Sequence, residues 1–255
     1  MLSLLDAAAP YIDRFRGIRI STRPDAIGNE ILRLLKSYGV TSIELGAQSM
    51  SDDVLRLNGR GHTAEDVRAA SRLITEHGFD LGLQMMTGLY GSSVDLDRYT
   101  AAEFLKLRPA TVRIYPTIVM RGTRLSELYQ SGVYQPQELD PAVELCAELL
   151  TMFTEHGVSV IRVGLHDTPS LERDRLAGPY HPAFRELCES RIMLNKALAL
   201  LNGKPAGAYS LAVSPRSRSK LTGNRKSNLT ALRDHGYTIQ IIEDDRMDTF
   251  DVVLA

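Results

Sequence analysis

Short apolar segments alternate with longer amphipathic segments along the first two thirds of this sequence, and this alternation limits the fold more than any other feature. The amphipathic segments carry apolar residues three and four positions apart, which is typical of helices, and two of them end at Gly39 and Gly78. Strands that alternate with helices usually pair in parallel. The sequence therefore predicts an α/β fold, with helices packed outside a mostly parallel sheet. The predicted strands are Gly17–Thr22, Ser42–Ala47, Phe79–Thr87, Thr111–Tyr115 and Val158–Leu165.

Polar residues and glycines gather where these predicted strands end. Gln48 and Ser49 follow the second strand, and Arg60 lies in a glycine-rich turn, Gly59–His62. Because the carboxyl ends of parallel strands share one edge of a sheet, we expect a ligand site at this edge. Each residue also has a plain structural explanation, as a surface or helix-end charge or as a hydrogen-bonding group within the sheet. The other candidates at this edge are Ser21, Arg23, Gln84, Gly88 and Arg121.

Two short patterns predict how the helices near this edge begin. Asp25 follows Pro24 and is placed to cap the next helix. Thr63 and Asp66 have the spacing of a capping arrangement for a helix over Ala64–His77. For the neighbouring His62 we favour a structural role.

Composition excludes several classes of protein. The formal net charge of −1 gives no overall attraction to nucleic acid or to a membrane surface. No apolar run approaches the roughly 18 residues of a membrane span, and the first residues lack the basic leader of a signal peptide. Cys146 and Cys188 lie in amphipathic segments and show neither disulfide nor metal-ligand spacing. We therefore expect two core thiols in a cytoplasmic protein.

The sequence changes character after residue 168. The segment Pro169–Pro182 is rich in charge, proline and glycine and predicts a linking loop, which a helix from Phe184 to Leu201 follows. We divide the chain into a core over residues 1–168, a linker and helix over 169–203, and a small basic α+β domain over 204–255. The elements predicted in that last domain are strands at Gly207–Val213, Tyr237–Ile242 and Phe250–Leu254 and a helix at Lys226–Asp234.

A run of basic residues lies in this last domain. Between Lys204 and Arg233 the chain carries seven basic residues and no acidic one. Such a patch can neutralise several phosphates, and without interleaved aromatic residues it would bind the backbone of a nucleic acid rather than stack on its bases. The alternative is a solvated basic face. The candidate nucleic-acid contacts are Arg216, Arg218, Lys220, Arg225 and Lys226.

Five motifs, in their order and spacing, resemble a known family. They look like the radical S-adenosylmethionine (SAM) proteins related to the catalytic subunit of Elongator, and more distantly like the oxygen-independent coproporphyrinogen III oxidases. The motifs are Ser21-Thr-Arg-Pro-Asp25, Gly46-Ala-Gln-Ser49, Arg60-Gly-His-Thr63, Met85-Met-Thr-Gly-Leu89 and Tyr115-Pro-Thr-Ile-Val-Met-Arg-Gly-Thr123.

This resemblance implies a partial parallel (β/α) barrel that uses a [4Fe-4S] cluster to cleave SAM reductively, on an unknown substrate for which RNA is a candidate. It implies that Arg60 pairs with the SAM carboxylate, a task that suits a guanidinium fork. It places the other contacts to SAM at the strand ends. These implied SAM-binding residues are Ser21, Arg23, Gln48 and Ser49, and we add Gln84 as a cofactor-binding candidate because of its place at the same edge.

The sequence departs from the family in one essential motif. It has no C-x-x-x-C-x-x-C, so it offers no metal ligands for the cluster, and no catalytic residue can be assigned. Its first strand matches the third strand of the family, so we expect a chain truncated by about two βα units, with an unpaired sheet edge. Two alternatives remain. One is a cluster-free relic or a module that binds RNA through its basic segment. The other is a barrel enzyme without a cofactor, for which only Glu44 and Asp25 offer carboxylates near the strand tips.

Overall fold

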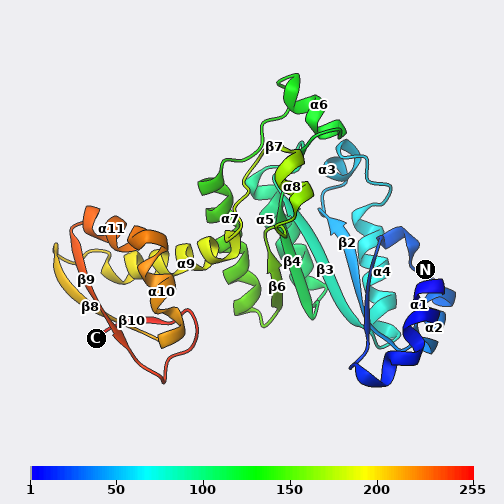
Figure 1. Ribbon diagram of the computed structural model, residues 1–255, viewed down its shortest axis with the longest axis horizontal. Coiled ribbons are helices and arrows are strands. Elements are labelled where there is room, and N and C mark those ends of the chain that lie inside the picture. The colour runs from blue at the N-terminus through cyan, green and yellow to red at the C-terminus, as the bar shows by residue number, and fades with distance from the viewer. Residues whose placement is uncertain (1) are drawn as a thin grey trace.

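A five-stranded parallel sheet is the framework of the molecule (Figure 1). The computed structural model describes residues 2–255, so Met1, the first residue of the expected core, lies outside the described residues. The strands follow the order β1-β2-β3-β4-β6, and every neighbouring pair is parallel. This confirms the predicted α/β fold. The strands are β1 (Ile18–Thr22), β2 (Val40–Gln48), β3 (Asp80–Thr87), β4 (Thr111–Pro116) and β6 (Ser159–Val163).

Helices cover one face of this sheet, while the other face is polar and partly open. Leu45, Leu83 and Ile114 point to the covered face and are fully buried in the larger hydrophobic core. On the opposite face Gln84 lies beside Arg113 in the register, and both are only half-buried. Most parallel sheets are covered on both faces, so this sheet resembles the wall of a partial barrel. The helices that contribute to its core include α2 (Asn29–Ser37), α4 (Ala64–Glu76), α5 (Val94–Lys106) and α7 (Leu139–Glu155).

The expected linking loop at Pro169–Pro182 is wrong in its first half. Helix α8 (Pro169–Asp174) begins there, capped by Thr168, and strand β7 (Arg175–Ala177) follows it. Strand β7 pairs antiparallel with β5 (Val119–Met120). Because this pairing joins segments far apart in the sequence, the local composition could not reveal it.

A second, smaller core lies in the C-terminal part of the chain. Its sheet has the order β10-β8-β9, with β8 and β9 parallel and β10 antiparallel to β8. The long helix α9 (Phe184–Leu201) belongs to both cores: Cys188 and Ile192 pack into the larger one, and Ala197 and Leu201 into the smaller. In Figure 1 this helix runs from the five-stranded sheet to the C-terminal unit. The boundaries at residues 168 and 203 stay a prediction. The other elements of the unit are β8 (Gly207–Val213), β9 (Tyr237–Glu243), β10 (Val252–Leu254), α10 (Arg218–Thr222) and α11 (Ser227–Asp234).

Short elements complete the chain. They are α1 (Leu2–Ala8), η1 (Ala9–Arg14), η2 (Pro24–Ala26), α3 (Asp52–Leu57), α6 (Arg124–Gln130), η3 (Pro215–Ser217) and η4 (Asn224–Lys226). Across residues 2–255, no helix has the length and apolar character required to cross a membrane.

Candidate functional site

The tips of β2 and β3 bring two glutamines together, as expected for strands that share an edge. The Gln84 Nε2 atom donates a hydrogen bond to Gln48 Oε1 at 3.2 Å. Gln48 is buried and has a φ of +66°, a left-handed backbone conformation that is uncommon outside glycine. Such strained backbone often occurs where a side chain must be aimed at a ligand.

Arg60 lies beside this glutamine pair. Its Nη2 atom donates to the Gly46 carbonyl at 3.2 Å, while its buried Nε has no hydrogen-bond partner within the described chain. Burial, followed by the like charge of Arg23, lowers the pKa of Arg60. A side chain at Gly46 would place its Cβ 2.9 Å from Gln48 Nε2 and 3.8 Å from Arg60 Nη2. Glycine at this position therefore leaves room for the Gln48 carboxamide, with the Arg60 guanidinium close by.

Arg23 reaches the same turn from the end of β1. A Cβ atom at Gly61 would lie 2.6 Å from Arg23 Nη2, so the guanidinium lies against the Gly59–His62 turn. Arg23 also forms a two-point ion pair with Asp25, at 2.9 and 2.6 Å, which lowers the pKa of the Asp25 carboxyl. The expectation that Asp25 caps the next helix is wrong, because the residue before α2 is Gly28 and Asp25 is bound to Arg23 instead. We call Arg23, Gln48, Arg60 and Gln84 the strand-tip cluster.

Ser21 and Ser49 do not join this cluster. The Ser21 hydroxyl donates to Glu44 Oε1 at 3.2 Å on the open face of the sheet, below the strand tips. Ser49 is buried, and its Oγ accepts a hydrogen bond from the Ser51 amide and lies 3.4 Å from Thr100 Oγ1 on α5. Both hydroxyls are therefore engaged within the protein.

The open sheet face carries an ion pair that the sequence patterns did not single out. Arg113 Nε lies 2.7 Å from Glu44 Oε2, although the two groups are not aligned as a hydrogen bond. Arg113 Nη1 also donates to the Tyr115 hydroxyl at 3.3 Å, and this contact is the main reason that the pKa of Arg113 is raised. The alternation of β4 could have placed Arg113 and Tyr115 on one face, but their partner on β2 depends on the register of three strands.

His62 supports the Gly59–His62 turn from its buried side, in line with the structural role expected from the sequence. It is buried, its Nε2 lies 3.1 Å from the Ala47 carbonyl, and burial lowers its pKa. A neutral imidazole is therefore favoured at this position, which fits a structural role.

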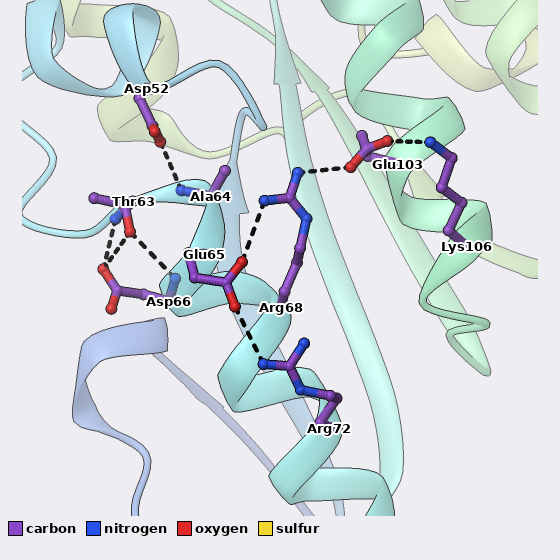
Figure 2. A network of polar contacts seen from close by, with 9 residues as sticks. All are labelled: Asp52, Thr63, Ala64, Glu65, Asp66, Arg68, Arg72, Glu103 and Lys106. Atoms are coloured by element: carbon purple, nitrogen blue, oxygen red, sulfur yellow. Dashed lines mark hydrogen bonds and ion pairs between the residues drawn. The ribbon is translucent and has the colours of Figure 1, made fainter.

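The segment beyond the turn is anchored by the network in Figure 2. Thr63 and Asp66 form the predicted capping box at the start of α4, and Asp52 accepts a hydrogen bond from the Ala64 amide at 2.7 Å. Further along α4, Arg68 pairs with Glu103 of α5 at 2.7 Å. These contacts tie α3, α4 and α5 together around the loop that carries Arg60.

The basic segment, defined as Arg216, Arg218, Lys220, Arg225 and Lys226, belongs to the C-terminal unit, which lies far from β1 and β2 in Figure 1. Arg218 pairs with Glu243 at 3.1 Å, and Lys220 pairs with Glu189 at 3.2 Å and lies over the Phe250 ring. The remaining three side chains are exposed and form no ion pair within residues 2–255. The basic run in the sequence is therefore partly neutralised by acids from other segments.

The described chain provides no assembled metal site. No group of three or more His, Cys, Asp or Glu side chains in residues 2–255 is placed to hold a metal ion. Cys146 and Cys188 are free thiols buried between α7 and α9, where the contact with Cys146, followed by burial, raises the pKa of Cys188. This agrees with their prediction as core residues.

Comparisons with known proteins agree with the motifs. A protein of Dehalococcoides mccartyi called tRNA uridine(34) acetyltransferase is 32% identical over 179 residues, covering 69% of this chain and 39% of that protein. Human Elongator complex protein 3 is 37% identical over 139 residues, covering 53% of this chain and 25% of its own length. The structure of the archaeal Methanocaldococcus infernus Elp3 with an N-terminal deletion is 29% identical, with a TM-score of 0.65, and covers 71% of this chain and 42% of that one.

The chain thus spans only a quarter to two fifths of the length of these curated relatives. Two family models match it in succession and together cover most of its length. The Radical SAM superfamily model matches residues 2–104, and the Radical_SAM C-terminal domain model matches residues 109–193. The chain belongs to the radical SAM superfamily.

Proposed function

We propose that the strand-tip cluster binds S-adenosylmethionine as part of a radical SAM enzyme that acts on RNA. The observation that carries this proposal is the convergence of Arg60 on the hydrogen-bonded pair Gln48 and Gln84, with a buried Arg60 Nε that has no partner among residues 2–255. The convergence occurs at the carboxyl ends of parallel strands, where such sheets bind ligands.

The chemistry of these side chains fits the polar groups of SAM. A guanidinium donates two parallel hydrogen bonds to a carboxylate, which suits Arg60 to the methionine end of the ligand. The carboxamides of Gln48 and Gln84 both donate and accept, which suits ribose hydroxyls. Arg23 would add a second positive charge, shared with Asp25. In this family, bound SAM and a reduced [4Fe-4S] cluster supply a 5′-deoxyadenosyl radical.

The side chains of this chain do not fit the cluster itself. Cluster binding in this family takes three thiolates, and the two cysteines present are buried between α7 and α9. The proposal therefore requires thiolates from outside these 255 residues. Within this chain, the strand tips bind and orient SAM, and the open polar face of the sheet is directed toward the substrate.

RNA is proposed as the substrate on two grounds. Relatives that match half or more of this chain carry the name tRNA uridine(34) acetyltransferase or Elongator complex protein 3. Three cations of the basic segment, Arg216, Arg225 and Lys226, are exposed and unpaired within residues 2–255, and they are free to contact phosphates. The same three residues support the second candidate function, a module that binds RNA without a cluster.

Calorimetric titration of the protein with SAM tests the first proposal. We expect measurable binding that weakens about tenfold in Arg60→Lys, because a lysine cannot replace a two-point contact. The matched control is Arg56→Lys, which changes an exposed arginine of α3 that pairs with Asp53. Equal affinities for wild type and Arg60→Lys, or no binding of SAM by the wild type, would contradict the proposal.

A further inference from the structure

A buried carboxylate in the first turn of α5 contacts the turn that follows β3. Asp97 is 2% exposed, and its two oxygens accept hydrogen bonds from the Ser92 hydroxyl at 2.6 Å and from the Gly88 amide at 2.8 Å. Burial raises the pKa of Asp97 to about 6, and the two hydrogen bonds only partly offset this effect. The protein thus keeps a costly group at the base of the turn that follows β3.

Tyr134 and Gln137 lie against Gly88, the first residue of this turn. The Tyr134 hydroxyl donates to the Gly88 carbonyl at 2.7 Å. Gly88 has a φ of +69°, and a Cβ there would lie 2.9 Å from Gln137 Oε1. That oxygen is buried and has no hydrogen-bond partner in the described chain. Gly88 is therefore held from both sides of its peptide group.

The same turn contacts the segment that carries Arg60. Asn58, at the end of α3, donates through Nδ2 to the Tyr90 carbonyl at 2.8 Å and to the Val54 carbonyl at 2.7 Å. Two residues further on, the Arg60 amide donates to the Leu55 carbonyl at 2.9 Å. Hydrogen bonds, joined by the short backbone segments between them, therefore connect Asp97 through the Gly88–Ser92 turn and Asn58 to the backbone of Arg60.

A purely local role does not explain the charge of Asp97. The N-terminus of α5 is already capped by Ser93, whose hydroxyl accepts from the Leu96 amide. An asparagine at position 97 would offer the Gly88 amide the same acceptor without the cost of a buried charge. What the carboxylate adds is a stronger, charge-assisted hold on the turn.

We propose that Asp97 is a positioning residue, whose carboxylate fixes the Gly88–Ser92 turn and, through the Tyr90–Asn58 hydrogen bond, fixes Arg60 in its ligand-binding place. This inference rests on the function proposed for the strand-tip cluster. It deepens that function by making the site depend on a group that contacts neither cofactor nor substrate.

Within residues 2–255, the groups around Asp97 include no counterion for its charge. Tyr134 faces it from the segment after α6, and burial together with the Asp97 charge raises the pKa of Tyr134 to about 12. Cys146 of α7 contacts Thr87 at the end of β3. Arg98, the next residue on α5, pairs outward with Asp95 and Glu148. Gly88 and Ser92 are therefore the groups that hold the carboxylate.

The test compares Asp97→Asn with Asp95→Asn, a matched control in the same helical turn whose carboxylate is 91% exposed. The first measurement follows the NMR signals of the Gly88 amide, the Asn58 side-chain amide and the Arg60 Nε as the pH is changed. We expect all three to shift together with a midpoint near pH 6 in the wild type and the control, and none to do so in Asp97→Asn. A Gly88 signal that titrates while those of Asn58 and Arg60 stay fixed would overturn the proposal.

The second measurement is SAM affinity at about pH 5 and about pH 7, on either side of the Asp97 midpoint. We expect the wild type and the control to bind several-fold more tightly at the higher pH. Asp97→Asn should bind about tenfold more weakly than the wild type at pH 7, and equally at both values, since one charge-assisted hydrogen bond is weakened. Unchanged affinity in Asp97→Asn would overturn the positioning role. Absence of SAM binding in every variant would contradict the proposed function, while the NMR titration would still decide whether Asp97 positions Arg60.

Discussion

The strand-tip cluster and the basic segment are both rich in polar side chains, but they differ in burial and in how their charges are paired. At the strand tips, residues from three strands and one turn converge, and the buried Arg60 Nε has no hydrogen-bond partner in the described part of the chain. In the basic segment, Arg218 and Lys220 are already paired with acids, and the other three cations are exposed. Buried, incompletely satisfied groups point to a specific ligand, whereas exposed charges point to a weaker, salt-sensitive contact.

The largest expected effect concerns the two cores that support these regions. Phe104→Ala removes a fully buried ring from the larger core and should lower the free energy of unfolding by about 3–5 kcal/mol. Because α9 contributes to both cores, we expect urea to unfold both regions in one transition, monitored by hydrogen exchange. Leu232→Ala removes a buried side chain from the smaller core, and the same measurement on this variant gives the corresponding test for that region. Two separate transitions in Phe104→Ala would show that the regions are independent.

The next effect is a pH dependence of the free energy of unfolding, which arises from Asp97 on α5, a helix of the larger core. Since the folded-state pKa of Asp97 is raised to about 6, the folded protein prefers the protonated acid. Its contribution to stability is present at low pH and is lost as the pH rises through 6. Relative to Asp97→Asn, the wild type should gain roughly 3 kcal/mol between about pH 7 and pH 3, measured by urea unfolding. A difference that stays constant with pH would contradict the raised pKa.

A smaller effect is expected in the basic segment. Arg225→Ala combined with Lys226→Ala should weaken RNA binding several-fold and reduce the slope of log affinity against log salt by about 1.5, as for two lost phosphate contacts. Arg246→Ala is the control, because this exposed arginine is paired with Asp244. Filter binding at several salt concentrations measures the slope. Binding that does not vary with salt would remove the basic segment from the proposal.

The smallest effect concerns the support of the turn. Thr63→Ala removes the side-chain cap of α4 and should lower the free energy of unfolding by about 1 kcal/mol. Thr75→Ala is a control on the same helix, since its hydroxyl only bonds back to the preceding turn. Equal losses in the two variants, measured by urea unfolding, would mean that the capping box contributes nothing specific.

Local patterns predicted most of the framework, and all four residues of the strand-tip cluster were among the candidates at the strand ends. The alternation of apolar segments gave the parallel sheet, and the polar residues at its ends included Gln48, Arg60 and Gln84. The same patterns misassigned Asp25, because its partner Arg23 competes for the carboxylate that a helix cap would use. Ser49 was included by proximity in sequence, yet its side chain engages Ser51 and lies beside Thr100.

The features that the sequence did not reveal depend on partners far apart along the chain. The pairing of β5 with β7 and that of Arg113 with Glu44 join distant segments. The neutralisation of Lys220 by Glu189 does the same. Asp97 and Asp95 are both acids in the first turn of α5, and the burial of Asp97 against Gly88 distinguishes it from the exposed Asp95. Burial of a polar side chain is set by tertiary packing, so no local pattern reports it.

The continuous helix α9 decides how this protein can be dissected. The first half of α9 packs into the larger core and the second half packs into the smaller one. A cut anywhere between residues 184 and 201 would therefore expose apolar surface on both fragments. A shortened version meant to isolate the sheet would have to retain the whole helix and cover the side chains at Met193, Ala197 and Leu201 by substitution. Helix α9 is thus a rigid structural element of both units and not a flexible linker between them.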